Sequence, residues 1–329
     1  MKNRKIRVGI MGCAAIAKRS VVPAFLAHSG YEVVAIASRL RMKARQFADE
    51  LMPDATAVSA LSYDELAQSK DVDLVYCPLP TGLHYEWAKK CLKYDKHVLC
   101  EKSLASTDGQ VRDLVALARK RGLLLMESFQ FRFHAQNLYV KRLLAEKTIG
   151  SVRQLVVRFG IPPFPEGSAN IRYSRDLGGG ALLDNGAYTV KASTYLLGQD
   201  ISILAATHGG ETPALGNVDL SGAIMMQTSD GVPIQTAYGF DHFYQNGYEI
   251  WGTDGKITTT RAFTARADFA APVIVETKSG RVEKTFRDDH FARLLDYVEA
   301  AIAAGRFEEE YGENLLQARL LADARRKMA

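Results

Sequence analysis

The sequence predicts a two-part α/β protein. Residues 1–128 are expected to form a doubly wound parallel sheet, and residues 129–329 an α+β domain with a large open-faced antiparallel sheet. Strand and helix patterns alternate up to residue 128, whereas short strands separated by turn dipeptides dominate afterwards. A length of 329 residues with 47% hydrophobic content leaves room for two separate cores.

In the N-terminal part, apolar β-branched runs alternate with amphipathic stretches. The last of these stretches spaces Val111, Leu114, Val115 and Ala118 as one apolar helical stripe. Strands connected through helices pair in parallel, which predicts a doubly wound parallel sheet. Strands are expected at 6–11, 32–37, near 57, at 74–77, 97–100 and 123–126, and helices from 16, up to 51, at 85–92 and at 109–120.

The pattern changes after a helix expected near 136–146. Four dipeptides typical of tight turns predict hairpins and therefore an antiparallel sheet; they are Asp230-Gly231, Asn246-Gly247, Asp254-Gly255 and Ser279-Gly280. Strands are expected at 152–160, 203–206, 223–227, 233–240, 248–251, 257–260, 273–276 and 282–286, and helices at 181–197, 289–304 and 314–327. A ligand site is expected in the cleft between the two domains.

Composition excludes several classes of function. The net charge of +5 comes from 42 basic and 37 acidic side chains without a like-charge block, so neither nucleic acid nor an anionic membrane is expected as a partner. No run approaches the roughly 18 apolar residues of a membrane span. The four cysteines form no C-x-x-C pair and fit buried positions in a reducing cytoplasm. Neither metal-ligand spacing nor a hydrolase or kinase motif is present, so no metal is expected.

The first strand ends in a turn of small residues that leads into a helix. Such a turn leaves backbone N–H groups free at the helix N-terminus, where a pyrophosphate can bind. Gly12 and Ala17 fit the dinucleotide pattern G-x-G-x-x-G/A, but Ala14 replaces the middle glycine. A generic strand-to-helix turn is the alternative. The expected phosphate contacts are Gly12, Cys13, Ala14, Ala15 and Ile16.

The second strand ends in Ser38 and Arg39, where an NAD-selective fold carries an acid for the ribose 2′-hydroxyl. A hydroxyl and a guanidinium suit a 2′-phosphate instead, which predicts NADP(H). Lys43 belongs to the same basic cluster and is assigned to the cofactor. Arg41 and Arg45 lie one helical turn apart and are interpreted as a solvated helix face.

Two further strands end in polar segments at the same edge of the sheet. Lys102 follows one of them and can serve as a proton donor or acceptor, or hold a substrate hydroxyl. A salt bridge with Glu101 or a surface acid is the structural alternative. The residues assigned to the cofactor at this edge are Pro78, Leu79, Pro80, His84, Glu101 and Lys102.

A run of three glycines, 178–180, leads into a helix with Asp184 and Tyr188 four residues apart and therefore on one face. A phenol beside the Lys102 ammonium is a plausible acid pair for protonating the alkoxide formed when hydride reaches a ketone. An ordinary core tyrosine is the alternative. His134 and Arg172 are candidate ligand contacts that could equally be structural.

Together these segments resemble the glucose-fructose oxidoreductase / inositol dehydrogenase / rhizopine catabolism (Gfo/Idh/MocA) family. Segments 161–163, 170–173, 248–252 and 261–264 look like its nucleotide-sugar 3-ketoreductases of deoxysugar biosynthesis. The resemblance implies a Rossmann domain with an open-faced sheet that is often an oligomer interface. Lys102 would match the catalytic lysine and Tyr188 the usual His or Tyr acid, with Asp184 nearby. Two departures are Ser103 in place of the usual proline, and Ala14.

The resulting expectation is an NADP(H)-dependent oxidoreductase that delivers hydride to the 3-keto group of a nucleotide-linked (dTDP) sugar. Tyr188 would donate the proton and Lys102 would orient the carbonyl, with His134, Arg172 and Asp184 as further substrate contacts. The alternatives are a free-sugar or cyclitol dehydrogenase, such as one that oxidises D-xylose at C1, and a non-catalytic sugar or NADP sensor. We expect a cytoplasmic homo-oligomer, a dimer or tetramer through the open sheet face.

Overall fold

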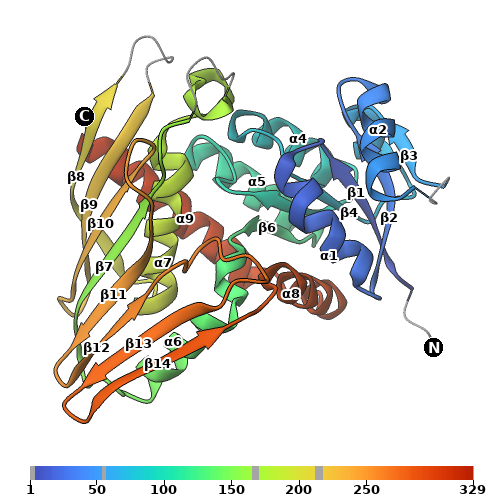
Figure 1. Ribbon diagram of the computed structural model, residues 1–329. Helices are drawn as coiled ribbons and strands as arrows, with labels where there is room; N and C mark the ends of the chain where they lie inside the picture. The colour runs from blue at the N-terminus through green and yellow to red at the C-terminus, as the bar shows by residue number, and fades with distance from the viewer. Residues whose placement is uncertain (1–3, 54–56, 165–169, 212–217, 329) are drawn as a thin grey trace. The chain divides into compact units, whose positions relative to one another are not determined.

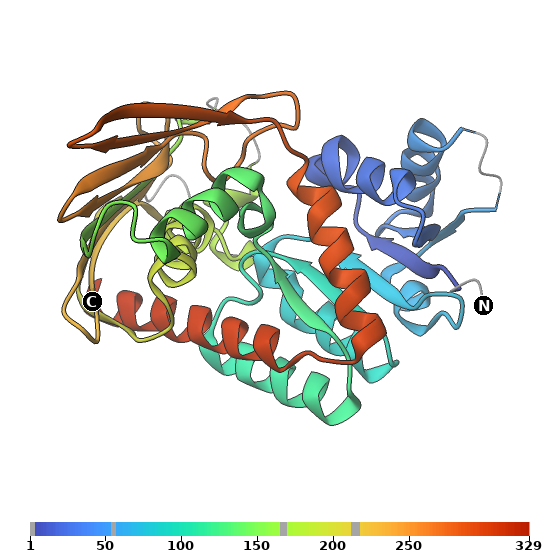
Figure 2. The ribbon, with the colours of Figure 1, turned by 90° about the horizontal axis from the view of Figure 1, so that it is seen from below.

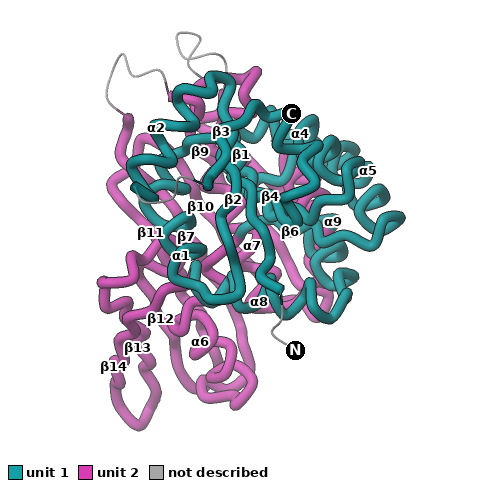
Figure 3. Tube along the Cα trace, turned by 90° about the vertical axis from the view of Figure 1, so that its right-hand side faces the viewer, with its two compact units in different colours: residues 1–128, 291–315 teal, residues 129–290, 316–329 magenta. Residues whose placement is uncertain are grey.

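The computed structural model describes residues 4–53, 57–164, 170–211 and 218–328 (Figure 1). The chain divides into two compact units. Unit 1 comprises residues 1–128 and 291–315, and unit 2 comprises residues 129–290 and 316–329 (Figure 3).

Unit 1 is built on a six-stranded sheet in the order β3-β2-β1-β4-β5-β6, in which every neighbouring pair is parallel. Consecutive strands run outward in both directions from the β1–β4 boundary, so the expected doubly wound sheet is confirmed. In such sheets ligands bind beyond the carboxyl ends of the strands at this boundary. The strands are β1 (Ile6–Met11), β2 (Tyr31–Ala37), β3 (Ser59–Leu61), β4 (Leu74–Cys77), β5 (His97–Glu101) and β6 (Leu125–Ser128).

Two helical segments of unit 1 differ from expectation. The helix after the first strand contains a π-helical stretch, and a short helix after β3 was not expected from the sequence. That short helix is held by a reciprocal capping box between Ser62 and Glu65. The helices are η1 (Ala17–Val21), α1 (Val22–Ala27), α2 (Arg41–Leu51), α3 (Tyr63–Gln68), α4 (Thr81–Lys93) and α5 (Asp108–Arg121).

Residues 291–315 belong to unit 1, although the sequence pattern assigned them to the C-terminal domain. They include most of α8 (His290–Ala304) and the start of α9 (Glu308–Met328), both visible in Figure 2. The Tyr31 hydroxyl donates to the Leu295 carbonyl at 2.8 Å, and the Asn314 amide donates to the Leu125 carbonyl at 2.8 Å. Helical periodicity identifies an apolar face but not the sheet that this face covers, so these contacts could not be foreseen.

Unit 2 is built on an eight-stranded sheet in the order β14-β13-β12-β11-β7-β10-β9-β8. The pairing is mostly antiparallel, as expected, but β7 and β10 pair in parallel. The strands are β7 (Val152–Gly160), β8 (Ile201–Glu211), β9 (Asp219–Thr228), β10 (Pro233–Gly239), β11 (Gln245–Gly252), β12 (Gly255–Thr259), β13 (Ala271–Thr277) and β14 (Gly280–Phe286).

The expected turn at Asn246-Gly247 is wrong, because both residues lie inside β11. The Asn246 side chain accepts from the backbone N–H of Phe263 at 2.9 Å and donates to the Thr264 hydroxyl at 2.7 Å. A Cβ at Gly247 would lie 2.2 Å from the Thr259 carbonyl oxygen. The asparagine thus anchors a neighbouring segment and the glycine permits close approach of a backbone, so neither forms a turn here.

One face of the unit 2 sheet packs against helices, and alternate side chains such as Met225 and Trp251 are exposed. The helix expected at 181–197 begins with a π-helical stretch. No helix in the described part of the chain has the length and apolarity needed to cross a membrane. The helices of unit 2, besides the end of α9, are η2 (Gln130–Phe133), α6 (Ala135–Ala145), η3 (Ile171–Tyr173), η4 (Arg175–Leu177), η5 (Leu182–Gly186) and α7 (Ala187–Leu197).

Candidate active site

The turn after β1 joins the strand to the following helix through small residues. Gly12 adopts φ +120°, and a Cβ there would lie 2.9 Å from Cδ2 of Leu79, so any other residue would strain the backbone and displace the Leu79 side chain. Ala14 lies at the beginning of the following helix, where its carbonyl accepts from the N–H of Lys18 at 3.1 Å. The half-buried Cys13 contacts the carbonyl of Lys43, and burial raises the pKa of its thiol. Phosphate binding by this turn, in which Ala14 replaces a glycine, stays a prediction.

The basic cluster after β2 separates into paired and available cations. Arg41 forms an ion pair with Glu65, and Arg45 pairs with Asp49. Within the described residues, the exposed side chains of Arg39 and Lys43 have no carboxylate partner. These two cations are therefore the ones available to a 2′-phosphate, beside the buried Ser38.

His84 connects the loop after β4 with the segment after β5. One ring nitrogen lies 2.6 Å from the Leu79 carbonyl oxygen and the other lies 2.7 Å from that of Ser103. Two acceptor carbonyls favour the protonated ring, but burial outweighs them and lowers the pKa of His84 to about 4. The imidazole therefore fixes the spacing of two segments assigned to the cofactor.

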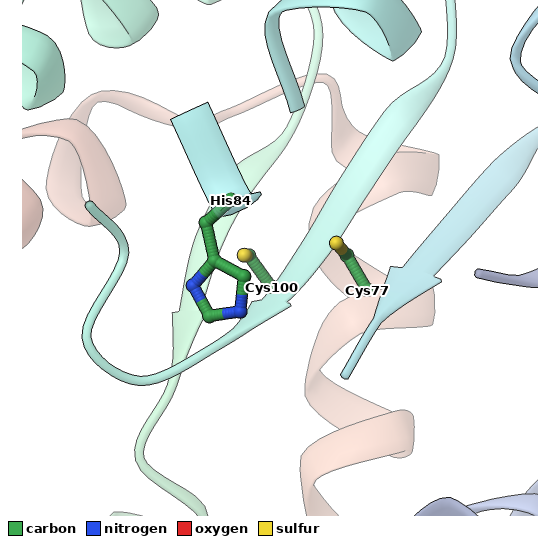
Figure 4. Close-up of side chains that lie close together, drawn as sticks. All are labelled: Cys77, His84 and Cys100. Carbon is green, nitrogen blue, oxygen red and sulfur yellow. The ribbon is translucent and has the colours of Figure 1, made fainter. Parts of the chain in front are cut away.

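The side chains of Cys77, His84 and Cys100 lie close together in the interior of unit 1 (Figure 4). Their sulfur and nitrogen atoms all lie within 4.8 Å of one another. Burial raises the pKa of Cys100, which keeps it a thiol, and both nitrogens of His84 already face carbonyl oxygens. Metal coordination requires thiolates and a free ring nitrogen, so these contacts favour a packing role for the three side chains.

Lys102 directly follows β5 and is half-buried, and the peptide bond between Lys102 and Ser103 is cis. The Tyr76 hydroxyl donates to the Glu101 carboxylate at 2.8 Å, and the Leu104 N–H donates to the Glu127 carboxylate at 2.9 Å. Burial raises the pKa of Glu101. On one side of Lys102 the Glu101 carboxylate is thus bound by Tyr76, and on the other side the buried Glu127 carboxylate holds the Leu104 backbone. The sequence interpretation did not identify Tyr76 or Glu127, because the sequence does not show that they contact Glu101 and Leu104.

In unit 2, Tyr188 lies in α7 with 6% of its surface exposed. The Gln130 amide donates to the Tyr188 hydroxyl oxygen and to the Phe263 carbonyl, each at 3.4 Å. Gln130 therefore orients the phenol, and sequence reasoning missed it. Four rings surround that of Tyr188 at centroid distances of 5.2–6.0 Å, namely those of Phe129, Phe131, Phe159 and Phe263.

Arg172 and Asp184 form an ion pair near the start of the helix that carries Tyr188. The Arg172 guanidinium also lies 5.2 Å from the ring centroid of Phe164. Burial lowers the pKa of Arg172, and the neighbouring phenols of Tyr188 and Tyr173 oppose that shift. Asp184 lies in the π-helical stretch and Tyr188 in the following α-helix, so the simple α-helical stacking expected for this pair does not apply.

His134 caps helix α6. Its Nδ1 accepts from the backbone N–H of Gln136 at 3.1 Å, and its buried ring packs edge-on against His290 at a centroid distance of 5.6 Å. These contacts give His134 a structural role, and a substrate contact by this residue stays a prediction.

Two models of protein families match the chain. Residues 6–129 match the oxidoreductase family with an NAD-binding Rossmann fold, and residues 137–258 match the GFO/IDH/MocA C-terminal domain. Full-length relatives agree with these matches. The chain belongs to the GFO/IDH/MocA oxidoreductase family. The resemblance noted in the sequence is therefore confirmed.

Relatives within this family include sugar reductases and dehydrogenases. The chain is 37% identical to a dTDP-3,4-didehydro-2,6-dideoxy-alpha-D-glucose 3-reductase of Saccharopolyspora spinosa, over 98% of this chain and 97% of that protein. It is 32% identical to a D-xylose 1-dehydrogenase (NADP(+)) of Haloferax volcanii, over 90% of this chain and 89% of that protein.

Among solved structures, the chain is similar to KijD10, a 3-ketoreductase from Actinomadura kijaniata, in complex with NADP and TDP-benzene. The TM-score is 0.92 and the identity 37%, with 99% of this chain and 98% of that chain covered. Other structures of KijD10 contain variants in which a tyrosine is changed to phenylalanine or a lysine to alanine or glutamate.

Proposed function

We propose that this chain is an NADP(H)-dependent oxidoreductase that reduces the 3-keto group of a dTDP-linked deoxysugar. The observation that carries the proposal is near-full-length similarity, at 37–38% identity, to three proteins that are dTDP-sugar 3-reductases. The similarity to KijD10 in complex with NADP and TDP-benzene supports the same cofactor and the same substrate class.

When bound, NADPH supplies the hydride, and the residues of unit 1 hold it. Gly12 leaves room for the pyrophosphate, and Arg39 with Lys43 supplies donors for the 2′-phosphate beside Ser38. His84 contributes indirectly, because it binds the backbone carbonyls of Leu79 and Ser103 and so positions the two segments that contain them. The complete set proposed for the cofactor is Gly12, Cys13, Ala14, Ala15, Ile16, Ser38, Arg39, Lys43, Pro78, Leu79, Pro80, His84, Glu101 and Lys102.

The chemical step needs a proton donor and a group that stabilises negative charge on the ketone oxygen. Tyr188 donates the proton, because a phenol can act as a general acid and the Gln130 amide binds its hydroxyl oxygen. Lys102 donates a charge-assisted hydrogen bond to the same oxygen. Arg172 and Asp184 bind sugar hydroxyls as an oriented pair. The mechanism requires the Lys102 ammonium and the Tyr188 hydroxyl to reach one ketone oxygen together.

The proposal is tested by supplying purified protein with NADPH and a dTDP-linked 3-keto deoxysugar and following NADPH absorbance together with product mass. We expect reduction to the 3-hydroxy sugar. D-xylose with NADP⁺ is the matched comparison, because a relative named D-xylose 1-dehydrogenase is 32% identical to this chain. Faster turnover of D-xylose would replace the proposed substrate class, and NADPH binding without turnover of any sugar would favour a sensor.

Two accompanying proposals concern the state of the protein. We propose a homo-oligomer that pairs through the exposed face of the unit 2 sheet, where Met225 and Trp251 lie. Light scattering of the wild type and of a Trp251→Glu variant tests this interface. A cytoplasmic location fits the four free cysteines and stays a prediction.

A further inference from the structure

The helix that carries Asp184 and Tyr188 is tied to the unit 2 sheet at its first turn. This helix consists of η5 followed directly by α7 and is called the Tyr188 helix below. The backbone N–H of Leu182 donates to the Asp219 carboxylate at 2.6 Å, and Asp219 is the first residue of β9 (Figure 1). The first N–H groups of a helix have no partner within the helix, and Ala181 at the N-cap offers no side-chain acceptor. Asp219 therefore caps the Tyr188 helix from the sheet.

The glycines before the Tyr188 helix leave the space that this contact needs. Gly180 adopts φ +111°, and a Cβ there would lie 2.2 Å from Oδ1 of Asp219. A Cβ at Gly179 would lie 2.4 Å from the Arg172 carbonyl oxygen, which accepts from the N–H of Gly180 at 2.9 Å. Any other residue at these two positions would separate the helix from Asp219 or from the segment of Arg172. The glycine run is thus the place where the helix, the sheet and the Arg172 segment meet.

The carboxylate of Asp219 also lies near a cation of helix α9. Burial raises the pKa of Asp219, whereas the N–H of Leu182 and the positive charge of Arg325 oppose that shift. Arg325 belongs to the last turn of α9, and Gln317 of the same helix donates to the Ala187 carbonyl at 2.9 Å. The Tyr188 helix is therefore held at its start through Asp219 and at Ala187 through Gln317.

The position of the first turn affects where the proposed reacting groups of unit 2 lie. Asp184 follows Leu182 by two residues and forms the ion pair with Arg172. Tyr188 follows four residues after Asp184, and a helix rises about 1.5 Å per residue, so Tyr188 lies within about 9 Å of Leu182 along the axis. Misplacement of a reacting group by about 1 Å can cost about 100-fold in rate. An acceptor that fixes the start of this helix can therefore control the rate of the chemical step.

We propose that Asp219 is a positioning residue for the reduction. Its carboxylate fixes the first turn of the Tyr188 helix to the sheet, and it thereby holds the Arg172–Asp184 pair and the Tyr188 phenol in place for the substrate. Asp219 acts through these residues and not by contact with the substrate. The inference rests on the proposed function, because it assigns a support for the proton donor of the same reaction.

The test compares Asp219→Ala with Asp219→Asn, in which an amide oxygen can still accept from the N–H of Leu182. With NADPH and the dTDP-linked 3-keto sugar, Asp219→Ala should lower kcat about 10- to 100-fold, whereas Asp219→Asn should stay within roughly fivefold of wild type. The KM for NADPH should change less than about threefold in both variants, since the cofactor is assigned to unit 1. Gly180→Ala breaks the same contact from the helix side and should reproduce the loss of kcat, which keeps the test decisive if Asp219→Ala does not fold.

Asp288→Ala is the matched control. Asp288 also accepts a backbone N–H at the start of a unit 2 helix at 2.6 Å, but its donor is Ala135 of α6. Loss of this contact should lower the melting temperature while kcat stays within about threefold of wild type. Wild-type kcat in a folded Asp219→Ala protein, or equal losses of kcat in Asp219→Ala and Asp288→Ala, would overturn the positioning role.

Hydrogen–deuterium exchange measures the same contact without turnover. The backbone amides of residues 182–188 should exchange at least about tenfold faster in Asp219→Ala than in wild type, and at the wild-type rate in Asp288→Ala. If the wild type oxidises D-xylose and does not reduce the dTDP-sugar, a loss of that activity in Asp219→Ala keeps the role of Asp219 and rejects the proposed substrate. If no sugar is turned over, the proposed function fails, and unchanged exchange in Asp219→Ala would overturn this inference as well.

Discussion

The two proposed catalytic groups are held by different kinds of structure. Around Lys102, the Glu127 carboxylate and the His84 ring bind backbone groups, and the Glu101 carboxylate accepts from the Tyr76 hydroxyl. Around Tyr188, four aromatic rings pack and the Gln130 amide contacts the hydroxyl. The first arrangement fixes a loop backbone, whereas the second fixes an aromatic ring. Loss of the functional atom should therefore disturb the fold little in both cases, while loss of the supports should disturb it differently.

The largest expected effect is that of Tyr188→Phe, which keeps the ring in its aromatic surroundings and removes only the proton donor. Because general acid catalysis contributes about 10²- to 10⁴-fold, kcat should fall by that factor. Steady-state kinetics measures kcat and KM, and a thermal melt measures the stability of the variant. The melting temperature and the KM for NADPH should change little. Full activity of this variant would remove Tyr188 from the mechanism.

Lys102→Ala tests the other half of the comparison. Removing one donor to a developing oxyanion costs about 10²- to 10³-fold in kcat, so a decrease of that size is expected. Since Glu127 holds the backbone N–H of Leu104 and Tyr76 binds the Glu101 carboxylate, circular dichroism should show an intact fold. Lys102→Arg is a useful companion: retention of most activity there would mean that charge alone suffices, without the ammonium geometry.

Arg39→Ala addresses cofactor choice and should leave both catalytic groups untouched. The loss of a charge-assisted contact to the 2′-phosphate is expected to raise the KM for NADPH about tenfold or more, with little change for NADH. Arg41→Ala is the matched control, because Arg41 is already paired with Glu65. An equal effect of Arg39→Ala on both cofactors would refute the assignment of NADP(H) selectivity to Arg39.

The smallest expected effect is on the free energy of unfolding at acid pH. It involves one buried histidine from each unit, His84 and His290. Burial lowers the pKa of His84 to about 4 and that of His290 to about 3. The unfolded chain takes up these protons near pH 6.5, so the stabilisation is complete above that pH and is lost as pH falls toward 4 and 3. Each group should lower the free energy of unfolding by roughly 1.4 kcal/mol per pH unit within its window.

Urea denaturation at several pH values measures this slope. His290→Gln should make the dependence between pH 6 and 3 shallower in unit 2, while a fluorescence probe in unit 1 should still report the contribution of His84. Identical slopes for wild type and His290→Gln would show that His290 titrates normally in the folded protein.

The parts of the fold that depend on local pattern were predictable. Alternating strands and helices predicted the parallel sheet, and short strands with turn dipeptides predicted the mostly antiparallel one. The sequence predictions were wrong where a residue contacts a partner far away in the sequence. Asn246-Gly247 has the composition of a turn, but it lies inside β11, where Asn246 binds the segment at Phe263 and Gly247 accommodates Thr259. Periodicity also could not place residues 291–315, because an apolar stripe does not specify the sheet that it covers.

The sequence by itself determined the two sheets and the small-residue turn at Gly12. It also predicted the NADP(H) preference at Arg39 and the candidate roles of Lys102 and Tyr188. These follow from local propensity and from the chemistry that each side chain carries along the chain. Only the tertiary structure decided which groups support the two proposed catalytic residues: Tyr76 binds Glu101 next to Lys102, and Gln130 binds the hydroxyl of Tyr188. The physical reason is that hydrogen bonds and ring contacts join residues far apart in sequence, and the spacing of residues along the chain does not show which of them come into contact.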